Sequence, residues 1–291
     1  MVPLMWAVLI AALGMAGYAG YLLWQAEAGY QQSDDSYAAL NAQVRSMDID
    51  IEASGAAQPG ADTWRQGATG EKDGIYIPKL RIDFGALKEV SQDAIAWLYC
   101  PDTAIDYPVM RASDYSYYLN HLPDGTVNAG GSLFLDYNCA PDFSGVLSIV
   151  YGHHMKSGSM FGSLEEYKKQ GYYEQHPCMY LYTPQGDYRI SLLYGCVIAA
   201  GEWRDRAFMF EENLPALLNY AAYNTTFSAN ATLYTPQEMV ALDAAGARVD
   251  KEGVSLDNAL GGEVAQDRFI VLSTCSYEFD EARYIVIGVV E

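Results

Sequence analysis

The sequence predicts a mainly β fold, in which one β-barrel-like domain with peripheral helices is preceded by an N-terminal transmembrane helix. Three observations lead to this prediction. Short runs rich in β-branched and aromatic residues, which are typical of strands, recur from about Gly74 to the C-terminus. Only two clear helical patterns lie among these runs, and no internal repeat is visible. The chain also opens with an apolar stretch, residues 2–24, that contains no charged side chain.

Residues 2–24 are long enough to cross a bilayer, because about 20 apolar residues in a helix span a hydrocarbon core of ~30 Å. A cleaved signal peptide is the alternative, since Ala26, Glu27 and Ala28 imitate a cleavage site. A signal peptide, however, begins with basic residues and has an apolar part of only about 7–15 residues. We therefore expect residues 1–24 to be an uncleaved anchor.

Residues 25–72 have the composition of a stalk or linker. A helix is expected from Tyr37 to Met47, and the chain after it is rich in Gly, Ala and polar residues. The remaining residues, 73–291, form the predicted domain. Their number suits one domain, and the 51% hydrophobic content of the chain is ample for a core.

The predicted strands of this domain are six mostly apolar runs. Pro184 to Asp187 is expected to form a hairpin turn between two of them. Ser163 and Glu166 match a capping box that opens a helix, and a second helix is expected from about Asn213 to Tyr223. The six runs are residues 131–137, 146–152, 178–184, 188–200, 268–275 and 283–290.

The charge balance excludes nucleic acid as a partner. The 291 residues include 17 Lys and Arg against 37 Asp and Glu, which gives a formal net charge of −20. A protein that binds nucleic acid needs a cationic face to neutralise phosphates, and this sequence contains no basic run. An anionic lipid surface is an equally poor partner for this balance.

The sequence indicates neither a metal site nor a cofactor. Its five cysteines stand singly, without a C-x-x-C pair, so they suggest neither a zinc site nor a disulfide framework. No D-x-D-x-D-G spacing suggests calcium. Because five is an odd number, at least one thiol is free, and Cys139, Cys178 and Cys196 are expected to be buried or half-buried.

Cys275, His153 and Arg283 each stand at the end of a predicted strand. Cys275 ends the run RFIVLSTC, and His153 follows the run VLSIVYG. Arg283 begins the next run, eight residues after the cysteine. If Cys275 and Arg283 flank a short connection between antiparallel strands, their side chains emerge close together.

Such a trio suits acyl transfer. A cysteine thiolate attacks a carbonyl carbon, an imidazolium protonates the departing amine, and a guanidinium stabilises the developing oxyanion. Taken singly, each residue also has a structural explanation: a buried thiol, a loop histidine and a surface charge on an edge strand. His154, next to the candidate histidine, is expected to be a solvent-facing loop residue.

The same residues resemble the signature motifs of class B sortases, a family of cysteine transpeptidases. The resemblance runs from about Phe84 to the C-terminus. Its three motifs around the trio are LSTC (272–275), YGH (151–153) followed by GSMF (158–161), and RYIVIG (283–288). The upstream segments that match the class B pattern are WLYCPDTAIDYPVM (97–110), YYL (117–119) and GSLFLD (131–136).

The resemblance implies an eight-stranded sortase barrel with an N-terminal helix and a helix-bearing loop before the cysteine strand. It implies that His153 is the general acid and base, that Cys275 is the nucleophile that forms a thioacyl intermediate, and that Arg283 stabilises the oxyanion and the substrate. Ser273 and Thr274, beside the cysteine, are implied as substrate contacts.

Three features depart from the family pattern. Tyr115 stands where the family usually has Asn, and Cys100 occupies a position that is usually aliphatic. The segment between Trp203 and Arg268 is longer than expected. It corresponds to the loop that recognises substrate in the family, so the preferred sorting signal is the property most affected.

The function implied is that of a membrane-anchored cysteine transpeptidase on the outer face of a Gram-positive-type cell. Such an enzyme recognises surface proteins by a C-terminal sorting signal, NPxTx-like or LPxTG-like, and cleaves it after Thr. The acyl group then passes to an amine of a peptidoglycan precursor or of a pilin.

Two alternatives remain open. A papain-like wall peptidase also uses Cys and His, but its cysteine ordinarily opens a helix and precedes the histidine, whereas here His153 comes 122 residues before Cys275. The second alternative is a non-catalytic surface scaffold that keeps the sortase barrel.

Overall fold

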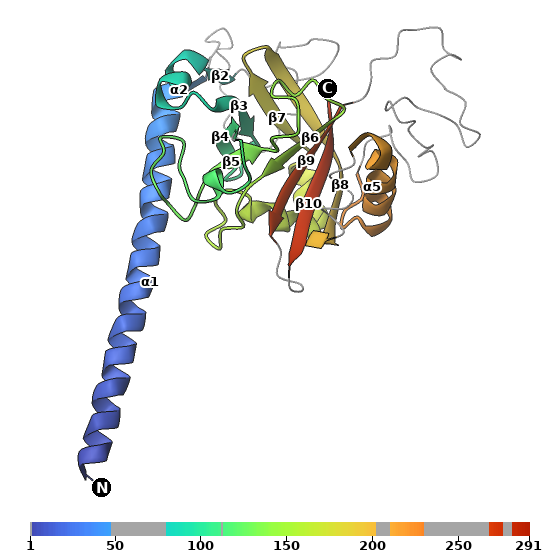
Figure 1. Ribbon diagram of the computed structural model, residues 1–291. Helices are drawn as coiled ribbons and strands as arrows, with labels where there is room; N and C mark the ends of the chain where they lie inside the picture. The colour runs from blue at the N-terminus through green and yellow to red at the C-terminus, as the bar shows by residue number, and fades with distance from the viewer. Residues whose placement is uncertain (1, 48–79, 112, 202–209, 230–267, 276–280) are drawn as a thin grey trace, which may run out of the picture.

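The structure is a computed structural model, which describes residues 2–47, 80–111, 113–201, 210–229, 268–275 and 281–291. Eight strands form a closed barrel in the order β10-β8-β7-β3-β4-β5-β6-β9 (Figure 1), so the predicted mainly β barrel is confirmed. The barrel strands are β3 (Ala94–Tyr99), β4 (Asp106–Arg111), β5 (Leu133–Leu135), β6 (Leu147–Tyr151), β7 (Cys178–Thr183), β8 (Gly186–Ala199), β9 (Arg268–Cys275) and β10 (Ala282–Val290).

The barrel is held by strands that are buried along nearly their whole length. The residues of β10 are buried or half-buried on both faces, and the 3-10 helix η2 (Gly162–Lys168) lies against this strand. Trp97 and Tyr182, which are register partners on β3 and β7, are among the largest fully buried side chains. Burial of such rings stabilises the fold by roughly 25 cal/mol per Å² of apolar surface removed from water.

Two of the strand pairs are parallel, β4 with β5 and β6 with β9. The other barrel pairs are antiparallel. Parallel pairing brings the C-terminal ends of β6 and β9 to the same end of the barrel. The antiparallel partner β10 begins at that end, so three strand ends meet there.

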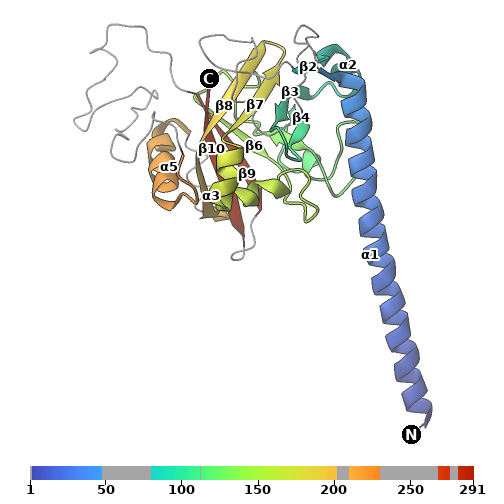
Figure 2. The ribbon, with the colours of Figure 1, turned by 180° about the vertical axis from the view of Figure 1, so that it is seen from behind.

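The N-terminal helix α1 (Val2–Val44) is continuous, and its N-terminal part projects beyond the barrel in Figures 1 and 2. Its C-terminal part docks on the barrel through Tyr37, Leu40 and Val44, which are buried. The Tyr37 hydroxyl donates a hydrogen bond to the carbonyl of Gly131 at 2.8 Å. The helix expected from Tyr37 therefore begins far earlier.

That helix also ends earlier than expected, because the last three residues of the expected segment are extended. They form β1 (Arg45–Met47), which pairs with β2 (Leu80–Ile82) in a separate two-stranded sheet. The short helix α2 (Phe84–Val90) follows β2, and the Asp83 carboxylate caps it by accepting from the amide of Ala86. The rest of the expected stalk, residues 48–72, lies outside the described residues.

In the part of the chain that the structure describes, no helix combines the length and the hydropathy needed to cross a membrane, so the transmembrane helix expected in residues 1–24 is not found. Residues 2–24 are instead the first half of α1. Several of its apolar side chains are exposed, among them Leu13, Leu23 and Trp24.

The capping box predicted at Ser163 does not form. The segment is a 3-10 helix, η2 (Gly162–Lys168), whose N-cap is Phe161 and makes no side-chain hydrogen bond. The Glu166 carboxylate binds Lys169 at 2.6 Å, and the Ser163 hydroxyl has no partner among the described residues. An α-helical turn, α3 (Gln170–Gln175), begins only afterwards.

The other local predictions are confirmed. The β7–β8 hairpin turns at Pro184 and Gln185, where the Thr183 hydroxyl accepts the amides of Gln185 and Gly186. The second predicted helix is α5 (Phe210–Asn224), which packs beside β8 with buried Leu217 and Leu218 (Figure 2). A further 3-10 turn, η1 (Tyr117–Leu119), lies in the connection between β4 and β5.

Candidate active site

Cys275 and Arg283 are register partners at the end of the barrel where β9 passes into β10. Opposite residues of an antiparallel pair carry their side chains on the same face, with Cβ atoms about 4.5–5.5 Å apart. The predicted juxtaposition of the two strand ends is therefore confirmed for the backbone. The connection between them, residues 276–280, lies outside the described residues.

His153 lies next to this pair, just past the end of β6. β6 and β9 run in parallel with Tyr151 opposite Ser273, and the amide of Gly152 donates to the Ser273 carbonyl at 3.2 Å. His153 lies two residues after Tyr151, just as Cys275 lies two residues after Ser273, so both follow the last pair of this parallel ladder. The structure thus brings His153, Cys275 and Arg283 to three adjacent strand ends.

The imidazole of His153 has a defined hydrogen bond. Its Nε2 lies 2.7 Å from the carbonyl oxygen of Leu119, the last residue of η1. A carbonyl only accepts, so Nε2 carries a proton and donates it. The carbonyl of His153 in turn accepts the amide of Phe161 at 3.0 Å. Of the two ring nitrogens, Nδ1 is therefore the one suited to proton exchange.

Ser273 and Thr274 occupy opposite faces of β9, because side chains alternate along a strand. Ser273 shares its face with its partner Ile285, and Thr274 shares the other face with its partner Tyr284. Both side chains are buried, and neither hydroxyl has a hydrogen-bond partner among the described residues. A buried hydroxyl left unpaired costs about 1–3 kcal/mol.

A buried carboxylate lies beside Tyr151, the last residue of β6. Asp136, directly after β5, is fully buried and accepts hydrogen bonds from the hydroxyls of Tyr115 and Tyr151 at 3.1 and 3.0 Å. Burial, followed by the nearby carboxylate charge, raises the pKa of both tyrosines above the usual range. The sequence did not predict this cluster, although Tyr115 and the segment GSLFLD, which ends at Asp136, were each singled out.

The expectation that His154 faces solvent is wrong. Its side chain is 9% exposed, and its Nε2 lies 3.4 Å from an oxygen of Glu165 on η2. Glu165 also binds the ammonium of Lys168 at 2.8 Å, and Lys168 lies over the ring of Tyr284 at 5.1 Å. Because Tyr284 follows Arg283, these contacts connect the loop after His153 with β10.

The other four cysteines are free thiols, and their placement is that of structural residues. Cys100, Cys139 and Cys196 are buried and Cys178 is half-buried, as predicted for the last three. Burial raises the pKa of Cys100, Cys139 and Cys196 to about 12. A thiol must lose its proton to act as a nucleophile, so these three are unreactive near neutral pH.

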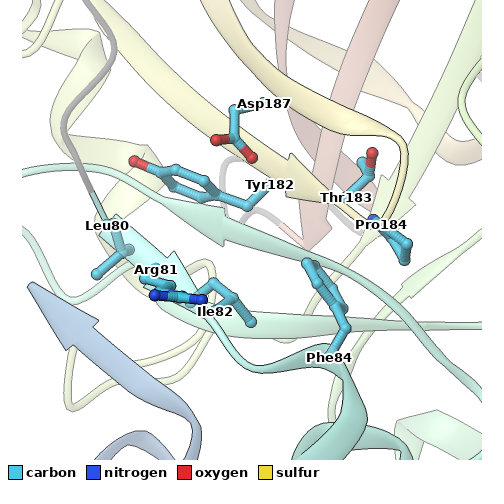
Figure 3. A pocket seen from close by; sticks show the side chains of 8 residues that line it. All are labelled: Leu80, Arg81, Ile82, Phe84, Tyr182, Thr183, Pro184 and Asp187. Atoms are coloured by element: carbon cyan, nitrogen blue, oxygen red, sulfur yellow. The ribbon is translucent and has the colours of Figure 1, made fainter. Parts of the chain in front are cut away.

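One further feature lies apart from the three strand ends. A pocket of about 320 Å³ is lined by β2, the start of α2 and the β7–β8 turn, where Arg81 and Asp187 face it together with Phe84 and Tyr182 (Figure 3). The β7–β8 turn is at the opposite end of the barrel from Cys275. Among the described residues, no group of three or more His, Cys, Asp or Glu side chains could hold a metal ion.

No protein-family profile matches the chain, but two curated relatives do. The chain is 26% identical over 212 residues to sortase B of Listeria monocytogenes, a match that covers 72% of this chain and 74% of the relative. It is 29% identical over 113 residues to sortase B of Staphylococcus aureus, which covers 39% of this chain and 46% of that relative. These matches bear out the resemblance that the motifs indicated.

Solved sortase B structures have the same fold, and each match covers 72% of this chain. The Staphylococcus aureus sortase B–substrate complex superposes with a TM-score of 0.55 at 21% identity over 84% of its chain. A Streptococcus pyogenes class B sortase involved in pilus biogenesis gives 0.55 at 24% identity over 98% of its chain. A sortase B complexed with triglycine gives 0.52 at 20% identity over 85% of its chain.

Proposed function

We propose that this chain, which resembles class B sortases in sequence and in fold, is a sortase-type cysteine transpeptidase. The observation that carries the proposal is the meeting of three strand ends, where Cys275 is the register partner of Arg283 and His153 follows the end of the adjacent strand β6. Acyl transfer needs a nucleophile, a proton donor and an oxyanion stabiliser within reach of one carbonyl group.

In the first half-reaction, the Cys275 thiolate attacks the carbonyl carbon of the substrate Thr at the scissile bond. The electron pair of the C=O bond moves to oxygen, and the Arg283 guanidinium stabilises this oxyanion. As the C–N bond breaks, the leaving amine takes a proton from Nδ1 of the His153 imidazolium. The product is a thioester on Cys275.

In the second half-reaction, an acceptor amine attacks the thioester carbon and passes a proton to Nδ1 of His153. The oxyanion collapses, the C–S bond breaks, and the new amide leaves the Cys275 thiolate behind. During both halves Nε2 of His153 stays bonded to the Leu119 carbonyl, which fixes the ring plane. Each residue thus returns to its starting protonation state.

The proposed substrate is a surface protein with a C-terminal sorting signal of the NPxTx or LPxTG kind, cleaved after Thr. The solved relatives support a peptide substrate and an amine acceptor, since one is a substrate complex and another is a complex with triglycine. The acceptor here would be an amine of a peptidoglycan precursor or of a pilin, and the pilin alternative is supported by the relative involved in pilus biogenesis. Ser273 and Thr274, the two residues before Cys275 on β9, are the proposed substrate contacts.

We further propose that residues 1–24 anchor the chain in the cell membrane, with the barrel on the outer side of a Gram-positive-type cell. The absence of charged side chains in residues 2–24 supports the membrane anchor. The exposed fractions of Leu23 and Trp24, 73% and 67%, also support it, because water is a poor environment for such side chains.

The test is product analysis of the full-length chain in phospholipid vesicles, with sorting-signal peptides and triglycine as the added amine. A transpeptidase gives the triglycine amide as the main product. A papain-like peptidase gives only free acid, and a non-catalytic scaffold leaves the peptides intact. Either of the last two results would overturn the proposal.

A further inference from the structure

The carboxylate of Asp136 gathers hydrogen bonds from three parts of the chain. Both of its oxygens accept from the Tyr115 hydroxyl, at 3.2 and 3.1 Å, and Oδ2 accepts from the Tyr151 hydroxyl at 3.0 Å. Oδ1 also accepts from the backbone and side-chain nitrogens of Asn138, at 2.8 and 3.1 Å. A fully buried carboxylate is stable only with such a set of donors.

One arm of this cluster leads to the backbone of His153. Tyr151 is the last residue of β6, where it pairs with Phe134 of β5 and Ser273 of β9. Its ring lies 5.4 Å from the ring of Phe134, centroid to centroid. Only Gly152 separates it from His153, so the bond to Asp136 fixes the strand end from which His153 emerges.

The other arm leads to the imidazole of His153. Tyr115 lies two residues before η1, and η1 ends at Leu119, whose carbonyl accepts the bond from His153 Nε2. The Tyr115 ring also packs edge-on against the Tyr151 ring at 6.0 Å. The bond from Tyr115 to Asp136 thereby holds the acceptor of His153 at a fixed distance from the strand that carries His153.

We propose that Asp136 is a positioning residue for His153, acting through Tyr151 on its backbone and through Tyr115 and Leu119 on its ring. The inference rests on the proposed function, in which Nδ1 of His153 must point at the departing amine. A ring held at its Nε2 and at its backbone has one orientation, and small misplacements of a proton donor lower the rate of transfer strongly.

The two tyrosines of the cluster are suited to this role because they remain hydrogen-bond donors as the pH rises. Burial and the carboxylate raise the pKa of Tyr115 and Tyr151, so both phenols keep their protons and remain donors throughout the working range.

The test compares Asp136→Asn, Tyr115→Phe, Tyr151→Phe and the double Tyr variant with a matched control, Asp106→Asn. Asp106 is a partly buried carboxylate that likewise accepts from an aromatic donor, Trp97 Nε1 at 2.7 Å, and its partners Trp97 and Arg45 lie outside this cluster. The readouts are kcat and KM for transpeptidation and the NMR signal of the His153 Nε2 proton, which the Leu119 bond protects from exchange.

We expect Asp136→Asn and the double Tyr variant each to lower kcat at least about tenfold, with KM within about twofold. We expect the Nε2 proton signal of His153 to broaden in both. The control should change neither readout by more than about twofold. The double Tyr variant keeps the carboxylate, so it separates loss of positioning from loss of charge, and it stands in if Asp136→Asn does not fold.

Normal kcat with a sharp Nε2 signal in folded Asp136→Asn or in the double Tyr variant would overturn the proposal. So would a fall in melting temperature without change in either readout, because it assigns Asp136 a structural role alone. The NMR signal does not need turnover. If the wild type transfers no acyl group but the signal behaves as expected, the proposed function fails and the arrangement around Asp136 stands.

Discussion

Arg283 is the register partner of Cys275 across β9 and β10, at the end of the barrel reached also by His153. This pairing follows from backbone hydrogen bonding alone, and residues opposite each other in an antiparallel pair are neighbours on one face of the sheet. A guanidinium at this position has several N–H donors for the region where charge develops during attack on a carbonyl. We therefore expect the rate of acyl transfer to depend on the planar geometry of the Arg283 guanidinium and not on its positive charge alone.

Replacement of Arg283 by Lys should lower kcat by about 10²-fold or more, and replacement by Ala should lower it further. Lys keeps the charge but lacks the planar fork of donors. The control is Arg189→Ala, since Arg189 lies 3.9 Å from Glu291 near the opposite end of β8. Equal activity of Arg283→Lys and the wild type in steady-state assays would argue against the oxyanion role.

Cys275 should react with a methanethiosulfonate at pH 7 far faster than Cys100, Cys139 and Cys196 under native conditions. Burial raises the pKa of Cys100, Cys139 and Cys196 to about 12, so their thiolates are scarce until the pH rises far above neutral. Mass spectrometry should find a label on Cys275 of the wild type and almost none on Cys100, Cys139 or Cys196, in the wild type and in Cys275→Ala alike. In denaturant the wild type should take up a label on each of its five cysteines. Fast native labelling of a buried cysteine would contradict this account.

Replacement of Gly152 by Ala should destabilise the protein by about 1–3 kcal/mol and lower kcat, because this residue links Tyr151 to His153. An added Cβ would collide with the side chain of Leu133 and come within 2.7 Å of the Phe161 ring. Thermal unfolding and steady-state kinetics measure the two effects. The control is Gly171→Ala on α3, where nothing lies within 4 Å, and there we expect a stabilisation of about 0.4–1 kcal/mol. If Gly152→Ala changed neither the thermal stability nor kcat, the tight packing of this strand end would be contradicted.

Replacement of Glu165 by Gln should lower both stability and kcat by modest amounts, about 1 kcal/mol and a few-fold. Glu165 joins His154 to Lys168, whose ammonium lies over Tyr284 beside Arg283. The matched control is Glu166→Gln, because Glu166 is on the same 3-10 helix and pairs with Lys169 in an exposed position. Exposed pairs contribute little, so the control should change stability by less than about 0.5 kcal/mol. A larger effect at Glu166 than at Glu165 would show that this connection is unimportant.

The sequence predicted the strands with strong β composition but not two of the eight. All six predicted runs are strands, because β-branched and aromatic residues mark them clearly. β3 and β4 contain Ala, Asp and Pro108, which weaken the β-strand composition. These two segments were noted only as part of the family motif over residues 97–110, not as strands. The capping box predicted at Ser163 does not form, because a motif of two residues does not determine which partner the Glu166 side chain binds. Glu166 binds Lys169 instead.

For the candidate site, the sequence predicted the residues of the trio and their strand ends, and the register then aligned them. The Asp136 cluster and the His154–Glu165 contact were not predicted. Each joins residues from separate segments, Tyr115, Asp136 and Tyr151 in the first case, and no local pattern encodes a hydrogen bond between distant segments. Such contacts form only when the folded barrel brings these segments together.

The most direct test of the central claim is the mass of the trapped acyl-enzyme. Full-length protein is mixed with a cleavable sorting-signal peptide, quenched with acid, digested and mapped by mass spectrometry. The account predicts the peptide fragment that ends in Thr as a thioester on Cys275, its disappearance when triglycine is added, and its absence from Cys275→Ala. A fragment attached to another residue, or continued cleavage by Cys275→Ala, would contradict it.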